Sequence, residues 1–264
     1  MAKSGMLTIS DSPQCFDHPT TRQLYATVIA CLVPAAGWGI FMFGWWAALV
    51  LCLAVASSVA SEYVIVRLLK RNWQFDGQVI LTGLLIGMVM PPDVPLFIPI
   101  LSSVFAVMVV KWPLGGTGSA WLHPAAAGWA FALVSWPEQM GRFKLPVWFS
   151  ASSDPVSSPA ATVKAWLESN PAGGFAPSDI LVSQGYFHSA IDNRFTDFIN
   201  NVVLAPLGAA LPVGYVDAFL GISPGSIGQV SAVLLLLGSV VLIGRKVIMW
   251  QLPAAFFASF AQKH

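Results

Sequence analysis

The sequence predicts an all-α polytopic membrane protein, and composition and hydropathy support that fold class. Of the 264 residues, 56% are hydrophobic and only 9% are charged, whereas soluble domains carry roughly a quarter charged residues. Mean hydropathy is +0.71. The apolar residues also fall into blocks of about 20, the length that a helix needs to cross a hydrocarbon core. We therefore expect about seven or eight transmembrane helices, broken or half helices included.

The apolar blocks define the expected spans in chain order. Residues 1–22 are polar and lack the charged start, apolar middle and small-residue cleavage site of a secretory signal, so the first span should stay as an anchor. A further apolar run covers 247–261. The spans are expected at 23–44, 45–69, 78–92, 95–111, 118–137, 196–216 and 229–244.

Basic residues predict the orientation, because cytoplasmic loops carry the excess of Lys and Arg. With a cytoplasmic N-terminus in the cell inner (plasma) membrane, the short outer loops carry no Lys or Arg. Counting crossings then puts the long polar segment 138–194 outside, and Arg245 and Lys246 outside as well. The cytoplasmic set is Lys3, Arg22, Arg67, Lys70, Arg71 and Lys111.

The chain divides into one membrane domain with one sizeable loop. We expect a cytoplasmic segment at 1–22, a five-helix unit at 23–137, an outer loop at 138–194 and a second helical unit at 195–264. The loop is rich in Ser, Pro, Ala and Gly, which is typical of turns. One short helix is expected in it near 162–169.

Two segments depart from plain spans. Segment 78–92 is short and ends in "MPPDVP", and segment 111–131 begins with a glycine cluster. Such breaks free backbone polar groups, so they survive at membrane depth only where protein or a cavity covers them. Paired broken helices commonly point positive helix ends at an anionic ligand. The alternative is that the glycines only permit close helix packing.

Isolated polar residues in the apolar segments are candidates for function, because ionisable groups in membranes usually face a cavity or a partner. Glu62 lies inside the second span, where snorkelling or pairing with Arg67 would explain it without function. Asp76, Thr82 and Asp217 also lie at or near membrane depth.

Two further sets of residues have ordinary explanations. Of the three cysteines, Cys15, Cys31 and Cys52, the last two lie inside apolar spans and are expected to pack as small apolar residues. The tryptophans at the expected span ends form an interfacial belt; they are Trp45, Trp46, Trp112, Trp136 and Trp148.

Three long motifs carry a resemblance to a known family. They read "DGQVILTGLLIGMVMPPDVPLF" (76–97), "KWPLGGTGSAWLHPAAAGWAF" (111–131) and "DAFLGISPGSIGQVSAVLLLLGSVVLIGRKVIMWQLP" (217–253). In order and spacing they resemble the D-type membrane subunit of Rnf electron-transport complexes and its sister, the B-type membrane subunit of the Na+-translocating NADH:quinone reductase. The resemblance implies ten helices in two inverted five-helix repeats. This chain matches the whole first repeat and the start of the second. Either it is a shortened paralogue or a partner chain completes the second repeat, and we expect the partner chain.

The resemblance also implies a covalent flavin. Family members carry FMN on a threonine of the outer loop, attached by a separate flavin transferase. The matching stretch is "VSSPAAT", which places Thr162 at the acceptor position. It departs from the family motif at Val156, Pro159 and Ala160. An alternative role for Thr162 is to cap a helix over the following "VKAWLES", because threonine is a common N-cap.

The glycine-rich segment is the second candidate site. The resemblance matches Gly115, Gly116 and Gly118 to a family motif that continues Asn-Pro-Ala, with His123 in place of the asparagine before Pro124. Backbone N–H groups exposed at a glycine break can bind a phosphate or a flavin edge. His123 would add a proton donor there, or serve as a hydrogen-bonded structural residue.

We therefore expect a redox subunit that holds FMN, with riboflavin as a second flavin, and that relays electrons coupled to Na+ or H+ movement. No Rossmann fingerprint is present in a βαβ setting, so NADH should bind another chain. The expected partners are the other subunits of an Rnf/Nqr-type complex, the flavin transferase and membrane lipid. A net charge of +1 gives no reason to expect nucleic acid. The alternative is a transporter, channel-type or assembly subunit that uses the same broken helices without a covalent flavin.

Overall fold

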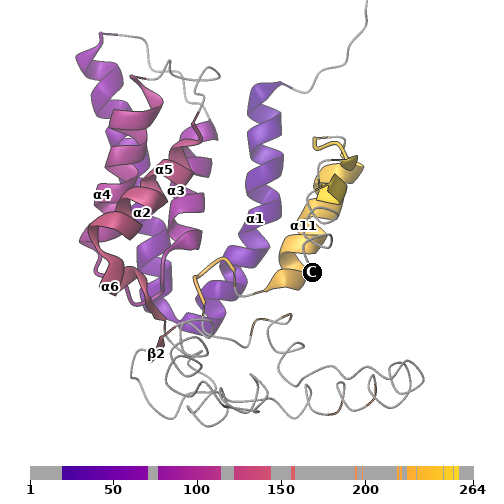
Figure 1. Ribbon diagram of the computed structural model, residues 1–264. Coiled ribbons are helices and arrows are strands. Elements are labelled where there is room, and N and C mark those ends of the chain that lie inside the picture. The colour runs from indigo at the N-terminus through magenta and orange to yellow at the C-terminus, as the bar shows by residue number, and fades with distance from the viewer. Residues whose placement is uncertain are drawn as a thin grey trace, which may run out of the picture.

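The computed structural model describes residues 20–70, 77–113, 122–143, 156–157, 225–229, 231–245, 247–251 and 253–255, and the single positions 194, 198, 219 and 221. These residues form a helical bundle, as predicted (Figure 1). The elements are α1 Thr21–Phe43, α2 Trp45–Leu68, α3 Gly77–Val89, α4 Phe97–Phe105, the π-helix η1 Ala106–Lys111, α5 Pro124–Ser135, α6 Pro137–Met140, β1 Arg142–Phe143, β2 Val156–Ser157 and α11 Ala232–Gly244. The two short strands pair antiparallel.

Helices α1 and α2 are the pair, within the described part of the chain, that are long and apolar enough to cross a membrane. They have 23 and 24 residues. Gly44 joins them with φ at 79°, a left-handed conformation that glycine adopts without steric cost. Shorter apolar helices follow at Gly77–Val89, Phe97–Lys111, Pro124–Ser135 and Ala232–Gly244, close to the spans expected from the sequence.

Helix α3 is broken by prolines, as the sequence predicts, and the structure shows what covers the break. Pro91 and Pro92 have no N–H, so the carbonyls of Gly87 and Met88 lose their usual donors four residues on. The Met88 carbonyl instead accepts from the N–H of Gly228 at 2.6 Å. The Met90 carbonyl accepts from the N–H of Ile227 at 3.1 Å. The segment of Ile227 and Gly228, far along the chain, thus supplies the hydrogen-bond donors that these carbonyls need and that lipid cannot provide.

Close packing of α3 on α2 depends on two glycines one turn apart. A Cβ on Gly83 would lie 2.7 Å from the Val55 Cα and 2.8 Å from the Ala54 carbonyl oxygen. A Cβ on Gly87 would lie 3.1 Å from the Leu51 Cα. Small residues four apart let two membrane helices approach at backbone distance, so the "GLLIG" of α3 is a packing motif.

We expect Gly83→Ala to lower the free energy of unfolding by about 1–3 kcal/mol, because the methyl group would clash with the backbone of α2 as well as with the buried Ser58 hydroxyl. Gly37→Ala is the matched control, since Gly37 is also helical and a Cβ there meets nothing within 4 Å. Alanine should be neutral or stabilising at that position. Unfolding in detergent measures both, and equal stability of the two variants would contradict the packing role.

Helix α11 runs antiparallel to α1, and this overturns one prediction. At one end of α11 the Ile227 carbonyl presses against Gly39, and near its middle Gly238 lies against Cys31. At the other end, Arg245 lines a cavity together with Gln23. Arg245 therefore lies at the N-terminal end of α1, and its predicted place on the opposite side is wrong.

The error came from counting crossings through the loop region. Helix α6 lies at the end of the bundle away from the start of α1 (Figure 1), and Ile227 lies against Gly39 near the C-terminal end of α1, so the chain leaves α6 and returns at Ile227 at the same end of the bundle. One crossing between them would have put them at opposite ends. Apart from Phe198, the expected span 196–216 lies outside the described residues. Arg22, Arg67, Lys111 and Arg245 all belong to the helix ends on the side of the N-terminus of α1.

Candidate functional site

Of the predicted cofactor-binding residues, the structure describes His123. Gly115, Gly116, Gly118 and Thr162 lie outside the described residues. His123 is the N-cap of α5, in extended conformation with φ at −68° and ψ at 118°. Its carbonyl accepts the N–H of Ala127 at 3.1 Å. Its exposed side chain makes no capping hydrogen bond, so the imidazole is available to a ligand.

Within the described residues, His123 lies apart from β1 and β2, which belong to the loop region 138–194. His123 precedes α5, whereas β1 and β2 come after α6, beyond the other end of α5. Figure 1 shows α6 and β2 at the end of the bundle away from the start of α1. The twelve residues of α5 span about 18 Å at 1.5 Å per residue. The glycine-rich segment and the loop therefore start from opposite ends, as two candidate sites.

A buried ion pair lies at the end of η1, immediately before the glycine-rich segment. The Lys111 Nζ donates to Glu62 Oε1 at 2.8 Å and to Glu62 Oε2 at 2.9 Å. The side chains are 0% and 7% exposed. The Trp112 Nε1–H points at Glu62 Oε2 from 3.4 Å. The Glu62 carboxylate on α2 therefore accepts hydrogen bonds from two consecutive residues at the end of η1.

The backbone at this position is π-helical. The N–H of Trp112 bonds to the carbonyl of Val107, five residues back, at 3.3 Å. Single π-turns within helices are rare and frequently mark functional sites. The wider turn places Lys111 and Trp112 toward Glu62 on α2. The ion pair and the π-turn together hold the backbone at the entry to the glycine-rich segment.

The partner of Glu62 differs from the prediction. Glu62 was expected to snorkel or to pair with Arg67, but Arg67 Nε donates to the Tyr63 hydroxyl at 3.1 Å and its guanidinium lies over that ring. Glu62 faces inward and pairs with Lys111. The sequence contained a signal for this pairing. Successive spans run antiparallel, so the second and fourth spans end on the same side of the membrane, which places Lys111 near the depth of Glu62.

The pair is neutral as a whole, and its energetics follow from burial. Removing two charges from water is costly, and their attraction offsets the cost only when both partners are present. Breaking such a pair by removing one partner costs about 3–5 kcal/mol. The arrangement therefore holds two helix ends in a fixed relation, and neither charge is left free to bind an external ion.

Other predicted polar positions have structural roles where they are described. Thr82 is buried, and its hydroxyl donates to the Gln78 carbonyl at 2.9 Å within α3. Cys31 and Cys52 are free thiols. Among the described residues no group of His, Cys, Asp and Glu could hold a metal ion. Trp45, Trp46, Trp112 and Trp136 lie at helix ends as predicted, whereas Asp76, Asp217, Cys15 and Trp148 lie beyond the described residues.

Comparison with known proteins shows what this chain is similar to. The model of the NQR2, RnfD, RnfE family matches residues 8–262. The D-type subunit of the proton-translocating ferredoxin:NAD(+) oxidoreductase complex of Clostridium ljungdahlii is 31% identical over 97% of this chain and 68% of its own length. The D-type subunit of the Na(+)-translocating ferredoxin:NAD(+) oxidoreductase complex of Acetobacterium woodii is 30% identical over the same shares.

A third relative, the D-type subunit of the ion-translocating oxidoreductase complex of Stutzerimonas stutzeri, is 30% identical over 86% of this chain and 61% of its own length. The family match covers the broken α3, the π-turn, α5 and α11 alike. The resemblance seen in the three sequence motifs is thereby confirmed. The chain belongs to the NQR2, RnfD, RnfE family of membrane proteins.

Proposed function

We propose that this chain is the membrane subunit of an ion-translocating electron-transport complex of the Rnf/Nqr type. One observation carries the proposal: nearly the whole chain aligns with the D-type subunits of ferredoxin:NAD(+) oxidoreductase complexes that translocate ions. The broken helix α3 and the π-turn of η1 support it, because they are the irregular membrane segments around which such proteins build binding sites.

The flavin is the finer part of the proposal. FMN is attached through the Thr162 hydroxyl, and the segment of Gly115, Gly116 and Gly118 with His123 binds a flavin or its phosphate; riboflavin is the second candidate cofactor. Among these residues the described His123 fits the role, since it starts α5 with an exposed imidazole that the helix does not use. A bound flavin supplies one- and two-electron chemistry, while the protein positions it and tunes its electronics.

The ion pair supports this second site from within the bundle. Glu62 and Lys111 fix the backbone three residues before the segment begins at 114. Pro124 at the first helical position of α5 fixes the backbone where the segment ends. Fixing the backbone on both sides of the segment reduces the ordering cost of binding there.

The proposed orientation follows from the side of the bundle on which the basic residues lie. The ends of α1, α2, η1 and α11 that carry Arg22, Arg67, Lys111 and Arg245 share one side. By the positive-inside rule that side is the cytoplasm of a cell whose inner membrane holds the protein. The proposed partners are the other subunits of such a complex, which the names of the D-type relatives indicate, and a flavin transferase.

The test is electron-driven ion movement in membrane vesicles. Vesicles from cells lacking this chain should neither transfer electrons from reduced ferredoxin to NAD+ nor take up Na+ or H+, and the full chain should restore both. Measuring ion uptake in a medium without Na+ identifies the coupling ion. Uptake should cease if the complex is coupled to Na+ and continue if it is coupled to H+.

Two results would overturn the proposal. Vesicles without the chain that still couple electron transfer to ion uptake would exclude it from the complex. A purified chain without flavin that moves a small solute in the absence of any electron donor would favour the transporter, because the same broken helices would then serve a different ligand.

A further inference from the structure

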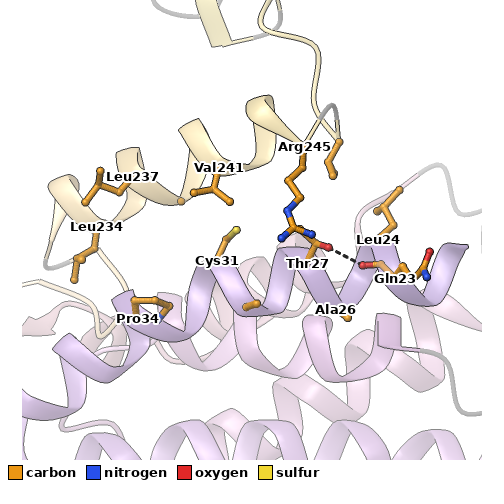
Figure 2. A pocket seen from close by; sticks show the side chains of 13 residues that line it. Gln23, Leu24, Ala26, Thr27, Cys31, Pro34, Leu234, Leu237, Val241 and Arg245 are labelled. Atoms are coloured by element: carbon orange, nitrogen blue, oxygen red, sulfur yellow. Dashed lines mark hydrogen bonds between the residues drawn. The ribbon is translucent and has the colours of Figure 1, made fainter. Parts of the chain in front are cut away.

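A cavity lies between α1 and α11, beside the contact of Gly238 with Cys31 (Figure 2). Its volume is about 820 Å³, which is within the range of small-molecule sites. It extends from Leu234 near the start of α11 to Arg245 at its end. Among the described residues, neither the ion pair nor His123 lines it.

The lining divides into a polar end and an apolar length. Arg245, Gln23 and Thr27 lie at one end, as Figure 2 shows. Apolar side chains and Cys31 line the remainder, which runs toward Leu234. The apolar set from the two helices is Ala30, Pro34, Leu234, Leu237 and Val241.

At the polar end, where Leu24 and Ala26 also line the cavity (Figure 2), the hydrogen-bonding groups that remain free are donors. The Thr27 hydroxyl is engaged with the Gln23 carbonyl at 2.8 Å, and the Gln23 Oε1 accepts the N–H of Thr20 at 3.1 Å. The guanidinium of Arg245 and the side-chain NH2 of Gln23 are left to donate. No carboxylate is among the described residues that line the cavity. Such a donor set selects an anion rich in acceptor oxygens, and arginine matches phosphate geometry in particular.

The dimensions match one leaflet of a membrane. Leu234 and Arg245 are both on α11 or at its end, so eleven steps of about 1.5 Å separate them by roughly 16 Å. Half of a hydrocarbon core of about 30 Å is nearly the same length. The charged end lies at the N-terminal side of α1, where the chain enters the bundle, so it coincides with the membrane–water boundary.

We propose that this cavity binds one anionic phospholipid. The phosphate accepts hydrogen bonds from Arg245 and Gln23, and an acyl chain lies along the apolar lining between α1 and α11. The lipid lies in the groove beside the contact of Gly238 with Cys31. The proposal is independent of the flavin, since the two use no residue in common.

The test measures lipid binding by native mass spectrometry on the full chain, purified with its partners in mild detergent. Dioleoylphosphatidylglycerol, dioleoylphosphatidylcholine and inorganic phosphate are added in separate titrations. Wild type should bind phosphatidylglycerol about tenfold more tightly than phosphatidylcholine, because both lipids carry the phosphate but the choline group adds a positive charge that Arg245 repels. Inorganic phosphate alone should not bind measurably, because it cannot fill the apolar length.

Two variants and one control locate the site. Arg245→Gln should remove the preference for phosphatidylglycerol, and Ala30→Leu should weaken both lipids by filling the apolar part. Arg22→Gln is the matched control, since Arg22 is an exposed arginine at the same end of α1 that does not line the cavity. Its lipid preference should equal that of wild type.

Each alternative result has a distinct meaning. Equal affinity for the two lipids, or a preference that survives in Arg245→Gln, would overturn the headgroup assignment. Inorganic phosphate that binds as tightly as the lipid would show that the cavity is a site for a free anion, and would overturn the lipid assignment. A photoactivatable acyl chain of phosphatidylglycerol should cross-link to the lining of α1 and α11; exclusive cross-linking elsewhere, with a partner subunit filling the cavity, would also overturn the proposal.

Discussion

Lys111→Met should lower the free energy of unfolding by about 3–5 kcal/mol, because it leaves the carboxylate of Glu62 buried without its partner. Both oxygens of Glu62 lie within 2.9 Å of the Lys111 Nζ, and the lysine side chain is fully buried. The loss should show as early thermal unfolding in detergent. It should also weaken flavin retention in the complex, since the π-turn holds one end of the glycine-rich segment.

The paired variant separates the ion pair from packing. Glu62→Gln combined with Lys111→Met removes both charges, so most of the lost stability should return. Lys70→Met is the control, since Lys70 is exposed at the end of α2 and exposed charges contribute little. Additive losses in the double variant, or equal stability of the two lysine variants, would refute a coupled buried pair.

Thr162→Ala should abolish covalent flavin on this chain. The phosphodiester bond needs the threonine hydroxyl, and alanine has none. Mass spectrometry of the peptide around residue 162 should detect FMN in wild type and none in the variant, while electron transfer through the complex falls sharply. Ser169→Ala, which removes another hydroxyl from the same loop, should leave the attached flavin unchanged.

Thr162→Asp distinguishes attachment from helix capping. Aspartate is as good an N-cap as threonine but cannot form the same phosphodiester. Under the flavin hypothesis it behaves like the alanine variant. Normal electron transfer in Thr162→Asp together with a loss in Thr162→Ala would instead assign Thr162 to the helix cap.

Most of the helices could be predicted, because the hydropathy of a segment directly indicates the length of a helix and its burial in the membrane. Helices α1, α2 and α11 begin and end within a few residues of the expected spans. The break after α3 was also predictable, since prolines at 91 and 92 remove two donors whatever the surroundings. These features depend on local chemistry, which a sequence contains.

Features set by tertiary contact could not be predicted in the same way. The sequence offered Glu62 a basic residue five positions away, and only the packing of η1 against α2 selects Lys111 instead. The side of Arg245 depended on how many times an intervening loop crosses the membrane. The role of Gly228 was equally hidden, because its N–H completes the broken end of α3 from another part of the chain.

The candidate site stays a prediction at Thr162 and the three glycines, which lie outside the described residues. His123 was identified from a sequence resemblance, and the structure adds that its side chain is exposed and unused by the helix it begins. The ion pair beside the glycine-rich segment was not predicted, because the shared side of the second and fourth span ends brings Lys111 near Glu62 without selecting it over Arg67.

The visible absorption spectrum of the purified complex, before and after chemical reduction, tests the central claim most directly. We expect a flavin spectrum that bleaches on reduction, with part of the colour staying on this chain after denaturation. A colourless preparation that still couples electron transfer to ion uptake would contradict a flavin-bearing role for this chain.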